Sequence, residues 1–112
     1  MLNVTKITDI PILHPQGRFE AYTIGPVRNW LDQNQEVANI VVDLSGVTFL
    51  DSTALATLVQ GMKHCRQLQG NLHLAGLQPS VKLIIELTRL DKAFGIYPDV
   101  TTAVSAFEHV HN

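Results

Sequence analysis

The sequence predicts an α/β fold in which a mixed, mostly parallel sheet of four to five strands is covered by about four helices. Short β-branched segments alternate along the chain with longer segments whose apolar residues recur every three or four positions. Parallel strands joined by right-handed helical crossovers account for this order. The 112 residues, 46% of them hydrophobic and 16% charged, suffice for one core but hardly for two. We therefore expect a single domain over residues 1–112.

The predicted strands are short runs rich in β-branched and aliphatic residues. Near the N-terminus, Pro11 and Pro15 interrupt such a run, which indicates an imperfect β-hairpin that ends near Gly17. Asn39–Asp43 has apolar residues at consecutive positions, as is typical of a strand buried on both faces. The remaining predicted strands are Asn71–Ala75, which alternates, and Phe94–Tyr97.

Four helices are predicted from apolar residues that lie three and four positions apart. Thr23 is a candidate cap for the first helix, where Pro26 is tolerated only in the opening turn. Asp99 is expected to cap the last helix, and Gly70 to end the second. The expected helices run from Ile24 to Gln33, from Asp51 towards Gly70, from Pro79 to about Arg89, and from Asp99 to Phe107.

Charge and cysteine content narrow the class of protein. The net charge is −2 and the eight basic residues are scattered, so the chain lacks the basic surface that nucleic acid requires. Cys65 is alone, which favours a small buried apolar residue in a reducing compartment. The N-terminus has no signal-peptide pattern, and no apolar run approaches the roughly 20 residues of a membrane span. We expect a soluble cytoplasmic protein.

Motifs of catalysis and cofactor binding are missing from the sequence. It has no GxxxxGK[ST], GxGxxG or GxSxG, the patterns of phosphate-binding loops and of the nucleophile elbow. The five histidines, at positions 14, 64, 73, 109 and 111, do not form a metal-binding pair, and surface or strand histidines are the expected reading. We therefore expect a binding module that is not an enzyme and holds no cofactor or metal.

One junction, within Val47–Leu55, combines an acidic residue with two hydroxyl side chains where the second helix begins. In one interpretation, Asp51 or Ser52 caps the helix by accepting backbone N–H bonds. In the other, Ser52 is a phosphoacceptor, because a helix N-terminus tolerates a phosphate dianion. The added charge of about −1.5 to −2 beside Asp51 would then repel a docked partner.

At this junction the sequence resembles the STAS family, the domain of sulfate transporters and anti-sigma factor antagonists, and most of all the stand-alone bacterial antagonists. The resemblance covers nearly the whole chain and implies a STAS-like single domain. The stretches that carry it are Ile40–Leu55, Gly70–Leu77, Val81–Leu90 and Phe94–Phe107.

The resemblance implies a phosphorylation-controlled partner switch. A partner that is both anti-sigma factor and serine kinase would phosphorylate Ser52, with Thr53 the less favoured acceptor, and a PP2C-type phosphatase would reverse the reaction. The unmodified antagonist would bind that partner and free the sigma factor, and the phosphorylated form would be released. The docking residues implied by the resemblance are Glu20, Asp51, Ser52, Thr53, Ala54 and Leu55.

Two residues depart from the family pattern, and other functions remain open. Glu20 stands where antagonists commonly have aspartate, and Ala54 stands where many have glycine. The methyl group of Ala54 would restrict the approach of a partner backbone. The alternative function is a non-phosphorylated STAS scaffold or regulatory subunit of a lipid or anion transport complex. A nucleotide-binding role has no supporting loop in the sequence.

Overall fold

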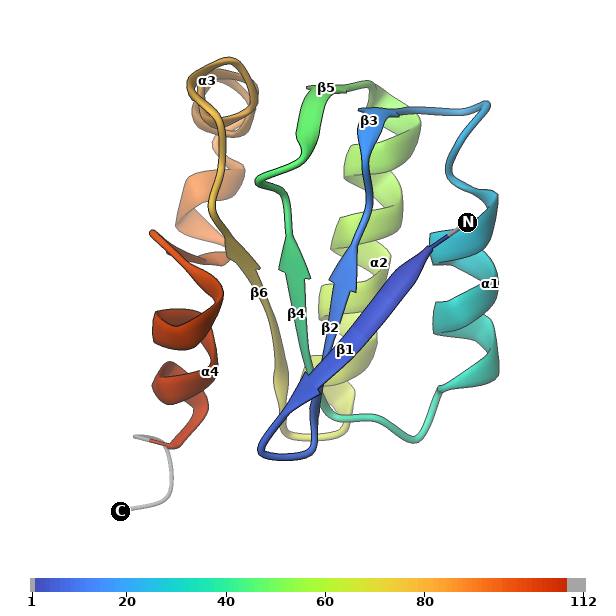
Figure 1. Cartoon of the computed structure of the whole chain (residues 1–112), viewed down its shortest axis with the longest axis vertical. Coiled ribbons are helices and arrows are strands. Elements are labelled where there is room, and N and C mark those ends of the chain that lie inside the picture. The colour runs from blue at the N-terminus through green and yellow to red at the C-terminus, as the bar shows by residue number, and fades with distance from the viewer. Residues whose placement is uncertain (1, 109–112) are drawn as a thin grey trace.

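In the computed structural model, which describes residues 2–108, a five-stranded sheet has the order β1-β2-β4-β6-β7 (Figure 1). β1 pairs antiparallel with β2, and all other neighbours in this sheet are parallel. The predicted mixed, mostly parallel sheet is therefore confirmed, including the N-terminal hairpin. The bounds are β1 (Asn3–Ile7), β2 (Ile10–His14), β4 (Asn39–Asp43), β6 (Asn71–Ala75) and β7 (Gly95–Tyr97).

Within residues 2–108, four α-helices cover the sheet unequally. Helices α1, α2 and α3 contribute to the larger core on one face, and α4 packs on the other face (Figure 1). The helices are α1 (Gly25–Gln33), α2 (Ser52–Gln67), α3 (Pro79–Leu87) and α4 (Val100–Glu108), with a short 3-10 turn at Leu90–Lys92.

Strand β4 lies between the two cores. Ile40 and Val42 face the larger core, whereas Val41 faces the core beneath α4. Because successive side chains point to opposite faces, a strand covered on both sides needs apolar residues at consecutive positions. The expectation of a doubly buried strand is confirmed.

A second, two-stranded sheet was not predicted. It pairs β3 (Gly17–Phe19) with β5 (Val47–Leu50) in parallel, with an irregularity between Gly17 and Arg18. A three-residue strand with a bulge has almost no periodic pattern, which explains why it was missed. This pairing places the segment after Phe19 beside the start of α2.

Three local expectations were wrong. Thr23 does not cap α1; its hydroxyl donates to the Arg18 carbonyl (2.6 Å) and accepts from the Glu20 N–H (3.0 Å), stabilising the turn before the helix. Helix α3 ends at Leu87 rather than near Arg89, because Arg89 has a left-handed backbone (φ +63°). Phe94 precedes β7, and its side chain is buried in the larger core. The C-terminal histidines at positions 109 and 111 lie outside the described residues.

His73 connects the sheet to α4. Its side chain is 5% exposed, stacks on Phe107 with ring centroids 3.8 Å apart, and lies 4.8 Å from the Tyr97 ring. Its Nδ1–H donates to the Ala103 carbonyl at 2.9 Å.

Burial lowers the pKa of His73 below 6.5, although the bond to Ala103 opposes this shift.

We expect His73 to make the fold sensitive to mild acid. Because its folded pKa lies below the unfolded value of 6.5, the unfolded chain binds the proton first, so stability is lost as the pH falls below 6.5. Urea unfolding at about pH 7.5 and about pH 5.5 should show a smaller loss for His73→Leu than for the wild type. His64→Leu removes a half-buried histidine elsewhere and is the control. An equal loss in wild type and His73→Leu would refute this assignment.

Candidate functional site

Asp51 initiates α2 and also holds the loop after β3. Its backbone is extended, and its Oδ1 accepts the Ala54 N–H at 2.9 Å, which is the geometry of a helix N-cap. Its Oδ2 accepts the Ala21 N–H, also at 2.9 Å. Of the two candidates for the cap, the structure therefore selects Asp51.

Ser52 takes no part in this cap. Its side chain is exposed, and within residues 2–108 no group forms a hydrogen bond with its hydroxyl. The helix that it begins is 16 residues long, so the hydroxyl lies at the positive end of a substantial helix dipole. A first-turn hydroxyl in this position is free for chemistry because Asp51 supplies the capping acceptor.

Both segments that meet at the start of α2 carry a carboxylate, Asp51 on one and Glu20 on the other. The Ala54 N–H, together with the Ala21 N–H, lowers the pKa of Asp51, so that its carboxylate is ionised at neutral pH. Glu20 pairs with Arg18 at 3.0 Å, and the Arg18 guanidinium also lies 4.2 Å from the centre of the Phe49 ring. A phosphate on Ser52 would therefore add negative charge to a region that already has the Asp51 and Glu20 carboxylates. The Arg18 guanidinium would not offset this charge fully, because it is already paired with Glu20.

The structure brings most of the predicted docking residues together. Glu20 belongs to the loop after β3, and the bonds of Asp51 to Ala21 and to the Phe19 carbonyl (3.4 Å) hold that loop against the start of α2. Glu20, Asp51, Thr53 and Leu55 are half-buried, and Ser52 is exposed.

Ala54 does not reach this surface. It is fully buried in the larger core. Its methyl group therefore cannot obstruct a partner backbone, contrary to the expectation from the sequence. An alanine at this position fills core space instead.

Three exposed apolar side chains on the elements next to this junction were not identified from the sequence. Tyr22, in the loop held by Asp51, is 94% exposed, and Leu87 and Leu83 on α3 are 74% and 54% exposed. Helix α3 packs against β5, the strand that leads into Ser52 (Figure 1). The signal was present, because α3 has more apolar residues than one buried face can use.

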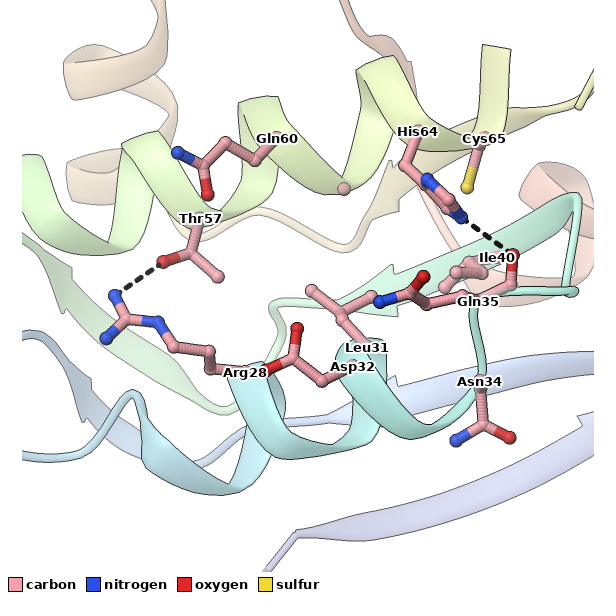
Figure 2. Close-up of a pocket in the computed structure, with 11 residues that line it drawn as sticks. Arg28, Leu31, Asp32, Asn34, Gln35, Ile40, Thr57, Gln60, His64 and Cys65 are labelled. Carbon is pink, nitrogen blue, oxygen red and sulfur yellow. Dashed lines mark hydrogen bonds between the residues drawn. The ribbon is translucent and has the colours of Figure 1, made fainter. Parts of the chain in front are cut away.

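A separate hollow of about 260 Å³ lies between α1 and α2 (Figure 2). Arg28 Nη2 donates to the Thr57 hydroxyl at one end (3.3 Å), and His64 Nε2 bonds to the Gln35 carbonyl at the other (2.7 Å).

Cys65 is fully buried, as expected, and burial raises the pKa of its thiol to about 11. The thiol is therefore protonated at neutral pH and a poor nucleophile.

Across the described residues, neither a metal cluster nor a membrane helix is found. No three His, Cys, Asp or Glu side chains between residues 2 and 108 are grouped so that they could hold a metal ion. In the same part of the chain, every helix is too short or too polar to span a bilayer.

The Asp51 carboxylate should matter for stability through both of its oxygens. Asp51→Ala removes the cap and the loop contact and should lower the urea midpoint more than Asp51→Asn, whose side-chain oxygen can retain one of the two bonds. Because the folded pKa of Asp51 is lowered, its stabilisation should be lost as the pH falls through that value. Equal midpoints for the alanine and asparagine variants would contradict the double role.

Comparison with known proteins yields one family. The family model "STAS domain" matches residues 1–103. The anti-sigma-B factor antagonist of Listeria monocytogenes is 37% identical over 76 residues, which are 66% of this chain and 67% of that protein. The anti-sigma F factor antagonist of Paenibacillus polymyxa is 26% identical over 102 residues, 88% of this chain and 87% of that protein.

Solved structures agree with the fold. The anti-sigma factor antagonist SpoIIAA in its unphosphorylated form has a TM-score of 0.82 at 14% identity, with complete coverage of both chains. The phosphorylated form of SpoIIAA, from Bacillus, has a TM-score of 0.74 at 13% identity and covers 95% of this chain and 98% of that one. With a family match over nearly its whole length and this shared architecture, the chain belongs to the STAS domain family.

Proposed function

We propose that this protein is an anti-sigma factor antagonist whose binding to an anti-sigma factor with serine kinase activity is switched off by phosphorylation of Ser52. The observation that carries the proposal is the division of roles at the start of α2. Asp51 provides the cap, so the exposed Ser52 hydroxyl can accept a phosphate without loss of the helix. Thr53 is the secondary candidate, since it is less exposed.

Phosphorylation would act mainly by charge. A phosphate of about −1.5 to −2 at Ser52 is compatible with the N-terminus of α2 and need not unfold the domain. It would lie beside the ionised Asp51 and near Glu20, and a partner seated there would have to desolvate and face this concentrated negative charge. The expected result is release of the partner.

The docking surface that we propose combines this acidic site with apolar side chains. Tyr22 follows Ala21 in the loop that Asp51 holds, and Leu83 and Leu87 lie on α3, which packs against β5. These are the three most exposed large hydrophobic residues in the described part of the chain, and large exposed apolar side chains on elements that adjoin one site are typical of a binding surface. A partner with an apolar patch and basic residues would complement them.

The relatives support this assignment. Two of them are named antagonists of anti-sigma-B and anti-sigma F factors, and SpoIIAA has been solved with and without phosphate. We carry this regulatory, non-enzymatic role to the present chain, together with a PP2C-type phosphatase that would restore Ser52 and action in the cytoplasm.

The first test is affinity capture from lysate of the native host with wild type, Ser52→Ala and Ser52→Asp as baits. Wild type and Ser52→Ala should retain a kinase-like ATPase, and Ser52→Asp should bind it at least about tenfold more weakly because of the added charge. Thr101→Asp is the matched control, because it adds the same charge to an exposed first-turn hydroxyl of α4 on the other face. Equal retention of transport components by all baits would favour the scaffold role and refute the switch.

The α3 leucines allow an independent test of the docking surface. Leu87→Asp should weaken binding of the captured partner about tenfold or more, because a desolvated apolar contact is replaced by a charge. Leu68→Asp provides the control, since Leu68 is 39% exposed but follows the opposite end of α2. Both affinities can be measured by calorimetry. Similar affinities for the two variants would exclude α3 from the interface.

A further inference from the structure

Thr5, His14 and Asp43 form a hydrogen-bonded chain across three strands, away from the Ser52 site. Thr5 Oγ1 lies 2.8 Å from His14 Nε2, and His14 Nδ1 lies 2.9 Å from Asp43 Oδ2. The three residues share the α4 side of the sheet. His14 and Asp43 each lie two positions after a residue of the core on that side, Ile12 and Val41, and Thr5 pairs with Ile12.

The direction of each hydrogen bond in this chain follows from the state of Asp43. Burial acts to raise the pKa of Asp43, but hydrogen bonds from Ser45 and His14 outweigh it, and the pKa is lowered. The ionised carboxylate can only accept, so His14 must carry its proton on Nδ1. In the neutral ring His14 Nε2 is then the acceptor, and the Thr5 hydroxyl donates to it.

We propose that Thr5 is a nucleophilic hydroxyl, activated by His14 and Asp43, that accepts an acyl group from activated esters. The order of hydroxyl, imidazole and carboxylate is the one by which His-assisted nucleophiles are recognised. Exposure is graded in the required direction: Thr5 is exposed, and the His14 and Asp43 side chains are 18% and 16% exposed. Thr5 also lies on β1, an edge strand, where a small ester can approach.

The chemical step is an acyl transfer. Thr5 Oγ1 forms a bond to the carbonyl carbon of the ester as its proton passes to His14 Nε2. The bond between that carbon and the leaving-group oxygen breaks, and the leaving group takes the proton from His14. Asp43 stays ionised and acts as a positioning residue, holding the imidazole with Nε2 towards Thr5. The product is an O-acyl threonine.

The test uses p-nitrophenyl acetate as the acyl donor and peptide mass spectrometry to follow acetylation of each residue over time. Thr5 should be acetylated about a hundredfold faster than Thr48, an exposed strand threonine of the same chain that serves as internal control. Thr5→Val, which preserves shape, should lose this fast adduct. His14→Asn should slow acetylation at Thr5 to about the rate of Thr48.

A second measurement does not depend on reactivity. Nitrogen-15 shifts of the His14 ring in the wild type should report the proton on Nδ1, and Asp43→Asn should move it towards Nε2 while slowing acetylation of Thr5. Equal rates at Thr5 and Thr48 in the wild type, or a wild-type His14 protonated on Nε2, would overturn the proposal. None of these outcomes bears on Ser52 phosphorylation, so the two proposals can fail separately.

Discussion

The carboxylate of Asp51 joins two segments that lie thirty residues apart in the chain, and the structure around Ser52 depends on this connection. One oxygen starts α2 through the Ala54 N–H, and the other holds the loop after β3 through the Ala21 N–H. The two donors use different oxygens, so both atoms of the carboxylate are needed for this arrangement. The position of the loop that contains Glu20 and Tyr22 against the start of α2 therefore follows from the geometry of one carboxylate.

This arrangement would allow helix capping and the proposed phosphorylation to coexist at neighbouring residues. A helix end needs an acceptor for its free N–H groups, and a phosphoacceptor needs a hydroxyl with no structural duty. If Ser52 were the cap, its phosphorylation would compete with the first turn of α2. With Asp51 as the cap, modification changes the charge of a surface whose backbone is already fixed.

The sequence predicted the elements that have a clear period and missed those that depend on contacts between distant residues. The strand at Asn39–Asp43 and the second helix follow from local patterns, and both were found. The β3–β5 pair was missed because β3 has three residues and is defined by its partner. The capping residue could be narrowed to Asp51 or Ser52 from the sequence, but the choice required the extended backbone of Asp51 and its bond from the Ala54 N–H.

The candidate site shows the same division. Ser52 was identified from the Asp-Ser-Thr junction and the family resemblance, whereas the burial of Ala54 and the exposure of Leu87 depend on how α2 and α3 are rotated against the core. The bond from His14 to Asp43 spans 29 residues, so no local pattern could predict it. Each of the two residues is the polar last residue of its strand, which is the only trace of their pairing in the sequence.

The unequal cover of the sheet has a consequence for how the domain opens. On one face three helices share a continuous core, whereas the other core, beneath α4, is small and depends on the contacts of that nine-residue helix with β4, β6 and β7. Detaching α4 would expose only this smaller core and leave the larger one closed. We therefore expect α4 to open before the larger core does, and this opening would leave Ser52 and helix α2 in place.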